Sequence, residues 1–307
     1  MASLTDPPPA RRLLVTGASG FLGGHLARAA QATWQVVGTY HRHCPTLAGL
    51  ALHPIDLTDA ALDPWLEALA PDAIIHAAAL SQPNRCEQEP ERSYAINVEA
   101  TRRLAEYCAR RAIPLVFTST DQVFDGQAAP YDETSPPSPI NRYGHHKAEA
   151  EALVQAVHPA AAICRLPLLY GPASPTAACF LQGFLRQLRA GQPLALFTDE
   201  FRTPAYVADA AAGLLLALEN ATGLLHLAGP ERLSRYDFGL RLAEVFDLDQ
   251  TLLVPSRQAD VPMAAARPAD VSSRCDRAYR LGYRPRGVVA GLIATRAAEA
   301  RPAPDLI

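Results

Sequence analysis

The chain has 307 residues, of which 49% are hydrophobic and 19% charged, and its formal net charge is −3. This length suits one compact body larger than an average domain, and the slightly negative charge predicts no nucleic-acid partner. No apolar stretch approaches the roughly 18 residues that a membrane-spanning helix needs, and the first residues do not resemble a secretory signal. The six cysteines are scattered without a Cys-x-x-Cys pair, which is typical of reduced thiols. We therefore expect a cytoplasmic protein without a membrane partner.

The first predicted element is a short buried strand over residues 12–16. A glycine-rich turn over 17–23 follows it, and then come a helix over 25–31 and a second strand over 35–39. Glycines in such a turn let the backbone approach a pyrophosphate, whose charge the N-terminus of the next helix stabilises. A glycine-rich turn alone is weak evidence. In the order strand, turn, helix and strand it predicts a nucleotide-binding βαβ unit.

Aliphatic strands and helical stretches continue to alternate further along the chain. Strands are predicted at 73–76, 115–118 and 160–165, and helices at 91–111 and 143–157. This alternation is typical of an α/β fold, and it predicts a Rossmann-type, doubly wound parallel sheet.

Later strands, at 194–197, 224–227 and 251–254, are expected to build a small C-terminal substrate lobe. We accordingly predict three parts. Residues 1–10, which contain three consecutive prolines, are a disordered lead-in. The Rossmann core occupies 11–170, and 171–307 is a mixed segment that forms the lobe and also returns to the core.

The strand at 115–118 runs into three consecutive hydroxyl residues, Thr118, Ser119 and Thr120. Ligands of open parallel sheets bind outside the carboxyl ends of the strands, which is where these hydroxyls fall. An ordinary polar strand end would have the same composition. We predict that Thr120 faces the ligand, with Ser119 as the alternative if the register differs by one residue.

The basic residues are unusual, because 27 are arginines and Lys147 is the only lysine. It follows Tyr143 by four residues, so a helix would place both side chains on one face. An unperturbed tyrosine titrates at about 10, and a neighbouring ammonium can lower the pKa of the phenol enough for proton exchange at neutral pH. Tyr-x-x-x-Lys can also be a chance pair on a solvated helix. The glycine turn and the hydroxyl-rich strand end favour a catalytic pair.

With these motifs in order, the chain resembles the extended short-chain dehydrogenase/reductases. In particular it resembles the dTDP-4-dehydrorhamnose reductases and their relatives, which include the regulatory β subunit of methionine adenosyltransferase. The matching segments cover almost the whole chain and are residues 16–23, 76–79, 95–98, 119–126, 131–133, 139–149, 165–171, 203–209 and 267–268. Two positions depart from the family pattern. Gln122 stands where the family has a tyrosine near the sugar, and Phe201-Arg202-Thr-Pro204 lacks a glycine that reductases of the rhamnose pathway often carry.

The resemblance implies an NADPH-dependent reductase of a 4-keto nucleotide sugar, as in dTDP-rhamnose biosynthesis. Tyr143 would donate the proton, Thr120 would help to hold the oxygen, and Lys147 would lower the pKa of Tyr143 and bind the nicotinamide ribose. The departure at Gln122 leaves the identity of the sugar in doubt. The expected substrate contacts are Ser81, Gln122, Val123, Phe124 and Arg202. We predict that Arg202 binds the diphosphate of the nucleotide sugar, and the alternative is that it pairs with Asp199 or Glu200 on the surface.

The end of the second strand bears on the choice of cofactor. Tyr40, His41 and Arg42 stand there without an acid, and an arginine at this place accommodates the 2′-phosphate of NADP. The sequence therefore favours NADP(H) over NAD(H). By resemblance, Asp56 would lie near the adenine and Asn97 would support the site from behind. The full set of expected cofactor-binding residues is Gly17, Ser19, Gly20, Phe21, Leu22, Gly23, Tyr40, His41, Arg42, Asp56, Leu57, Ala77, Ala78, Ala79, Asn97, Tyr143, Lys147 and Leu168.

Two other functions remain open. Asp121 follows Thr120, and an acid at that place is usual in dehydratases, so an epimerase or dehydratase of the same superfamily is one alternative. The other is an NADP-binding regulatory subunit without catalysis, against which the intact catalytic set argues. No metal site is predicted, because His41, His43 and Cys44 are more typical of a loop than of a zinc site. The expected partner is a nucleotide-activated keto sugar, and the chain is a possible homodimer.

Overall fold

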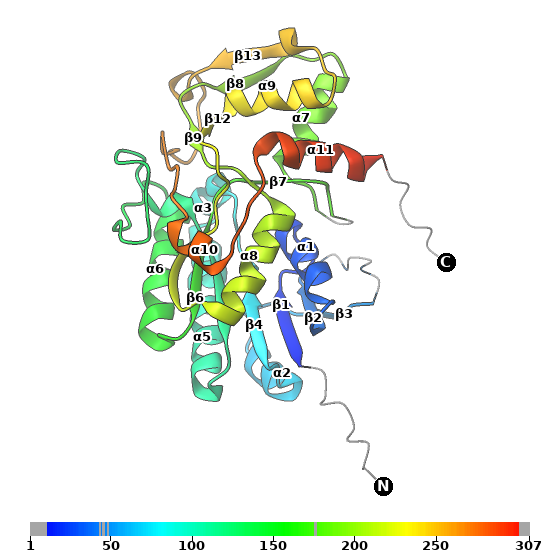
Figure 1. The fold of residues 1–307 in the computed structure, drawn as a ribbon. Coiled ribbons are helices and arrows are strands. Elements are labelled where there is room, and N and C mark those ends of the chain that lie inside the picture. The colour runs from blue at the N-terminus through cyan, green and yellow to red at the C-terminus, as the bar shows by residue number, and fades with distance from the viewer. Residues whose placement is uncertain (1–10, 43, 45–46, 48, 175–176, 301–307) are drawn as a thin grey trace.

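The computed structural model describes residues 11–300 except 43, 45–46, 48 and 175–176. The predicted lead-in over 1–10 and His43 lie outside the described residues. Figure 1 shows a core of strands flanked by helices, with a smaller lobe above it that contains α7, α9, β8 and β13. No described helix combines the length and the apolar character that crossing a bilayer requires.

The core is a parallel sheet of seven strands in the order β11-β6-β5-β4-β1-β2-β3. The strands are β1 (Arg12–Thr16), β2 (Gln35–Tyr40), β3 (Ala51–Pro54), β4 (Ala73–His76), β5 (Leu115–Thr120), β6 (Ala162–Leu166) and β11 (Gly223–His226). The order reverses direction between β1 and β4, and ligands of such sheets bind beyond the strand ends at this switch point. The predicted doubly wound α/β fold is confirmed.

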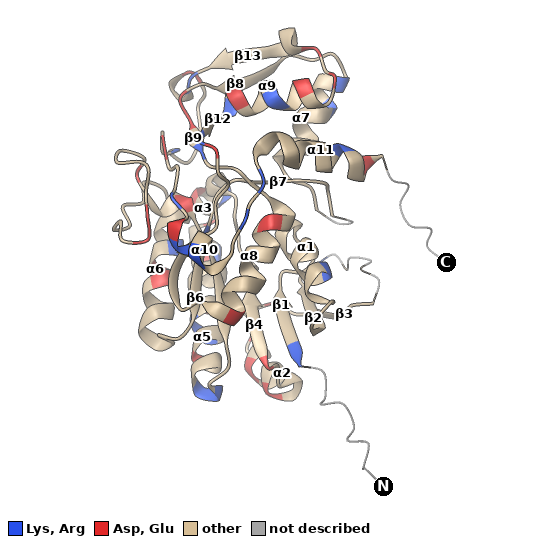
Figure 2. Cartoon of the chain, viewed as in Figure 1, with Lys and Arg blue, Asp and Glu red and all other residues tan. Residues whose placement is uncertain are grey.

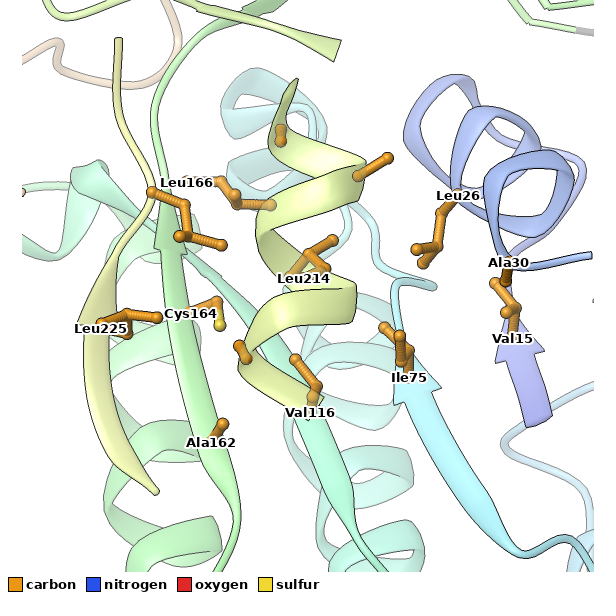
Figure 3. Close-up of a cluster of buried hydrophobic side chains, with 14 of the residues drawn as sticks. Val15, Leu26, Ala30, Ile75, Val116, Ala162, Cys164, Leu166, Leu214 and Leu225 are labelled. Carbon is orange, nitrogen blue, oxygen red and sulfur yellow. The ribbon is translucent and has the colours of Figure 1, made fainter. Parts of the chain in front are cut away.

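Alternating residues of each strand pack against helices on opposite faces of the sheet. Leu13 and Val15 belong to the apolar cluster under α1 (Phe21–Ala30) and α8 (Val207–Asn220). In Figure 3, Leu26 of α1 and Leu214 of α8 lie over side chains of the neighbouring strands. Burying one such aliphatic side chain contributes about 1.5 to 3 kcal/mol, so this layer holds the glycine-rich turn, which joins β1 to α1, in place.

The other face of the sheet is covered by α2 (Leu62–Leu69), α5 (Ala100–Arg111) and α6 (Arg142–Val157). Leu14, between Leu13 and Val15, packs into this second cluster, as the period of two in a strand requires. Because α6 follows β5 and lies on this face, its first turn reaches the carboxyl end of the sheet. The beginning of α6 is where Tyr143 stands.

The helix predicted over 91–111 is interrupted. In its place the chain forms α4 (Pro90–Tyr94), a π-helical turn η1 (Ala95–Glu99) and α5, after a short α3 (Pro83–Gln88). A π turn adds a residue to a helix and is frequent at functional sites. Here it contains Asn97, whose side-chain amide bonds to both backbone groups of Leu80.

The lobe has its own apolar core. It is built from α7 (Phe180–Arg189), β8 (Leu194–Phe197), α9 (Arg235–Val245), β13 (Leu253–Ser256) and α11 (Val288–Glu299), and β8 pairs with β13 in parallel. The assignment of 224–227 to the lobe was wrong, because β11 pairs with β6 and extends the central sheet. Short elements join the two parts: β7 (Leu169–Tyr170), β9 (Phe201–Arg202), β10 (Ala205–Tyr206), β12 (Leu233–Ser234) and α10 (Asp276–Leu281).

Candidate functional site

A cavity of about 1080 Å³ opens at the carboxyl ends of the central strands. Its lining comes from the core and from the lobe, and its size is that of a cleft for a cofactor and a small molecule. Most of the predicted site residues line it: Gly17, Ser19, Gly20, Phe21, Leu22, Gly23, Tyr40, His41, Asp56, Leu57, Ala77, Ala78, Ala79, Ser81, Thr120, Gln122, Tyr143, Lys147, Leu168 and Arg202.

The glycine-rich turn forms one end of the cavity. Gly17 has a φ of +70°, and a Cβ at this position would lie 2.8 Å from the Cα of Ala78, so only glycine fits between the ends of β1 and β4. The N-cap of α1, Gly20, has no side-chain capping bond, which leaves the first N–H groups of the helix to a ligand. A bare helix N-terminus behind a tight glycine turn fits the pyrophosphate of a dinucleotide.

Buried hydroxyl groups fix the backbone beside this turn. The Oγ1 of Thr16 accepts hydrogen bonds from the backbone N–H groups of Ala77 and Ala78, at 3.1 and 3.2 Å. The same hydroxyl lies 2.7 Å from Nδ1 of His76, whose other ring nitrogen meets the Thr101 hydroxyl. Burial lowers the pKa of His76 to about 3, helped by the charge of Lys147, so His76 is a neutral structural residue.

At the end of β2, the side chains of His41 and Asp56 form a pair, with Nε2 and Oδ2 3.2 Å apart. Both line the cavity, which places an acid near the end of β2 although it comes from the segment after β3. The side chain of Arg42 is exposed and does not line the cavity. The contact of Arg42 with the cofactor stays a prediction.

Thr120 and Tyr143 both line the cavity, and the Thr120 hydroxyl hydrogen-bonds to the Tyr143 phenol. A Cβ on Gly144 would lie 2.2 Å from the carbonyl oxygen of Gln122, so this glycine allows the first turn of α6 to pack directly on the turn after β5. The N-cap of α6, Asn141, accepts a hydrogen bond from the N–H of Gly144, and its amide donates to Oε1 of Gln122. These contacts hold Tyr143 beside the end of β5.

The prediction that Lys147 lowers the pKa of Tyr143 is not supported. Burial raises the pKa of the Tyr143 phenol, and the nearby Thr120 hydroxyl only partly opposes this effect. Burial also lowers the pKa of Lys147 from 10.5 to about 7, against the charge of Glu151. The Nζ of Lys147 lies 4.0 Å from the centroid of the Phe117 ring. In this arrangement the phenol is fully protonated at neutral pH and the lysine is the group that titrates there.

A buried ion pair lies behind the predicted catalytic residues. Glu151, one turn after Lys147, binds the guanidinium of Arg165, with Nη2 and Oε2 2.6 Å apart. Its Oε1 also accepts a hydrogen bond of 2.5 Å from the Ser119 hydroxyl. Ser119 is thus engaged in a short bond, whereas the Thr120 hydroxyl donates only a longer one, of 3.3 Å, to Oδ1 of Asp121. This difference favours Thr120 as the hydroxyl that a ligand can engage. Asn97 likewise lies behind the cavity wall, where it holds the backbone of Leu80.

Two of the predicted substrate contacts are wrong. Val123 and Phe124 are fully buried and do not line the cavity. The Phe124 ring stacks on Tyr131, with the centroids 4.0 Å apart. The 3₁₀ turn η2 (Asp121–Val123) directs Gln122 toward the cavity and turns the next two side chains into a small separate core.

Arg202 lines the cavity, but carboxylates occupy its guanidinium. Its Nη1 lies 2.8 Å from Oδ1 of Asp121, and its Nη2 lies 3.2 Å from Oε1 of Glu200. The pairing with Glu200 agrees with the alternative weighed from the sequence, except that the pair is buried and not on the surface. This arrangement does not leave Arg202 open to a phosphate.

The chain matches the model of the RmlD substrate binding domain family over residues 11–287. It belongs to this family. Among curated RmlD-like relatives, it is 37% identical to "Probable low-salt glycan biosynthesis reductase Agl14" of Haloferax volcanii, over 83% of this chain and 86% of that protein. It is also 32% identical to methionine adenosyltransferase 2 subunit beta of Xenopus tropicalis, over 89% of this chain and 83% of that protein.

Solved structures agree with the RmlD assignment. A hypothetical dTDP-4-dehydrorhamnose reductase from Sulfolobus tokodaii is 31% identical, with a TM-score of 0.77 over 88% of this chain and 94% of that one. The dTDP-4-dehydrorhamnose reductase of Bacillus anthracis in complex with NADP has a TM-score of 0.82 over 94% of this chain and 99% of that one. At 24% identity, the second likeness shows the fold alone.

Four arginines that the sequence did not single out as site residues also line the cavity: Arg85, Arg92, Arg235 and Arg267. Asp121 and Glu200, which the sequence suggested only as a dehydratase-type acid and as a partner of Arg202, line it as well. Arg267 lies in the segment 267–268, which matches the family pattern. Its guanidinium donates to Oδ1 of Asn84. Arg235 stands in the first turn of α9, where a sequence gives no sign that the side chain faces a ligand. Within the part of the chain that the structure describes, no group of three His, Cys, Asp or Glu side chains could hold a metal ion.

Proposed function

We propose that this RmlD-family protein is an NADPH-dependent reductase of a 4-keto nucleotide sugar. One observation supports this best: Thr120, Tyr143 and Lys147 line the same cavity as the glycine turn, where the first N–H groups of α1 have no side-chain cap. A binding protein without catalysis has no need of such a set. The reductase-like relatives point in the same direction.

When bound, NADPH would supply the hydride for the carbonyl carbon. Side chains of the protein donate the proton and hold the reacting groups. Tyr143, with its pKa raised by burial, is protonated at neutral pH and gives its proton to the developing alkoxide oxygen. The Thr120 hydroxyl holds the same oxygen, while Lys147 donates to the ribose of the cofactor and can supply a proton near pH 7.

The test is NADPH oxidation, followed by its absorbance, with a panel of dTDP- and UDP-4-keto sugars. We expect turnover with at least one of them and a reduced sugar as product. Conversion of a sugar without net NADPH consumption would instead indicate an epimerase or dehydratase. The relation to methionine adenosyltransferase β subunits makes a regulatory subunit the second candidate. NADPH binding without turnover of any sugar would favour that role.

NADPH should bind more tightly than NADH, because Arg42 provides a positive charge at the end of β2. We expect Arg42→Ala to reduce the difference by about 1.5 to 3 kcal/mol, the range for a charged hydrogen bond. Fluorescence titration of both cofactors measures it, with Arg28→Ala, an exposed arginine of α1, as the control. Equal affinities in the wild type would show that Asp56, in its pair with His41, governs the choice instead.

A further inference from the structure

The wall of the cavity on the lobe side carries five charged residues. Asp121 comes from the turn after β5, Glu200 and Arg202 from the segment around β9, Arg235 from α9, and Arg267 from the segment before α10. Basic and acidic segments lie together where β9 and β12 join the lobe (Figure 2). The glycine turn between β1 and α1 lines the same cavity from the side of the core.

Two buried polar atoms of this wall have no hydrogen-bond partner among the described residues: Oδ2 of Asp121 and Nη1 of Arg235. Leaving such a group unpaired costs about 1 to 3 kcal/mol, and more when it is charged. Both residues line the cavity. A ligand that offers an acceptor to Arg235 and a hydroxyl to Asp121 would relieve both costs.

The two arginines that meet at Glu200 are not equivalent. Arg202 has a side chain only 5% exposed and uses both sides of its guanidinium on carboxylates. Arg235 has a side chain 22% exposed and touches Glu200 through Nε at 3.3 Å. Its guanidinium lies 4.9 Å from the centroid of the Phe180 ring, another residue of the cavity lining. Arg235 is therefore the more exposed of the two arginines, and its Nη1 has no partner among the described residues.

Charge favours an anion at this place. Three arginines share the wall with Glu200 and Asp121. Burial alone would raise the pKa of Glu200, but Arg235 and Arg202 together lower it, so Glu200 is ionised. Burial raises the pKa of Asp121 despite the charge of Arg202. The arginines thus exceed the carboxylates, and Arg267 already donates to neutral acceptors, the Ala265 carbonyl and the Asn84 amide.

We propose that Arg235, and not Arg202, binds the phosphate groups of the nucleotide sugar, with Oδ2 of Asp121 facing a sugar hydroxyl. Arg202 is a positioning residue that holds Asp121 and Glu200. Glu200 competes with the ligand for Arg235 and so sets the affinity of the site. The identity of the ligand rests on the proposed function, but the anion site itself does not.

The experiment is calorimetric titration of inorganic pyrophosphate, and then of UDP and dTDP, into protein saturated with NADP⁺. We expect Arg235→Gln to weaken pyrophosphate binding about ten- to a hundredfold, the range for one charged hydrogen bond. Glu200→Gln should tighten it, because it removes the competing carboxylate. Arg241→Gln, also on α9 but paired with Glu231 outside the cavity lining, is the matched control and should change nothing.

Circular dichroism melting of each variant separates loss of binding from loss of fold, and the opposite signs expected for Arg235→Gln and Glu200→Gln cannot both arise from unfolding. Unchanged affinity in folded Arg235→Gln would overturn the proposal. So would pyrophosphate binding that disappears on saturation with NADP⁺, because the anion would then belong to the cofactor. If the wild type oxidises no NADPH with any sugar but the titrations behave as expected, the proposed function fails while the anion site stands.

Discussion

Tyr143→Phe should reduce turnover by a factor on the order of 10² to 10⁴, the range for loss of a general acid. The variant removes only the hydroxyl, and the ring keeps its packing against Leu80 and Cys86. NADPH affinity should stay close to that of the wild type. Steady-state kinetics with the preferred sugar and cofactor titration measure the two effects separately.

Tyr94→Phe is the matched control for this substitution. Its hydroxyl donates to Glu149 at the surface, and Tyr94 does not line the cavity. We expect wild-type turnover from it. A Tyr143→Phe enzyme with turnover near the wild-type value would remove Tyr143 from the mechanism and leave Lys147, with its pKa of about 7, as the proton source to examine.

The nucleotide-binding unit could be predicted from the sequence because its signals are local. The end of β1, the glycine turn and the beginning of α1 are contiguous, and Gly17 is required by the backbone of the turn itself. Tyr143 and Lys147 were recognisable for the same reason, since i and i+4 fix their common face on a helix.

What the sequence could not reveal depends on contacts between distant segments. Val123 and Phe124 follow the end of β5, where catalytic residues are predicted, but a 3₁₀ turn and the packing of Phe124 on Tyr131 bury them. An arginine such as Arg202 is suited to bind a phosphate, but its Nη1 donates to Asp121, which lies 81 residues away in the sequence. The apolar pattern of 224–227 suits a strand of the lobe as well as a strand of the central sheet. Only its pairing with β6 shows that it belongs to the sheet.

The pKa of Tyr143 illustrates the same limit. Helical spacing predicts that Lys147 is near, and a nearby ammonium lowers the pKa of a phenol. The spacing does not predict that both side chains are almost completely buried. Burial disfavours the charged forms of both groups, and it is the largest effect on the pKa of each.

Lys147→Arg should abolish most of the activity, although it keeps the positive charge. The planar guanidinium is larger than the ammonium and cannot lose its proton near pH 7. The ammonium that it would replace is almost completely buried beside the Phe117 ring. Turnover and NADPH affinity of Lys147→Arg and Lys147→Met, measured together, check this. An active Lys147→Arg enzyme would mean that only the charge matters and that the single lysine in an arginine-rich chain is a coincidence.

Lys147→Met should make the cofactor-free protein more stable at neutral pH by a few kcal/mol, since a pKa unit corresponds to about 1.4 kcal/mol. Lys147 has a pKa of about 7 when folded, against 10.5. Between these values the unfolded chain binds more protons, so the wild type gains stability as the pH rises.

The advantage of the methionine variant should be largest below pH 7 and shrink toward pH 10. Urea unfolding of both proteins from pH 6 to 10 measures the difference, in which the titration of groups distant from Lys147 cancels. A difference that does not depend on pH would show that Glu151 keeps the pKa of Lys147 near its usual value in the folded protein.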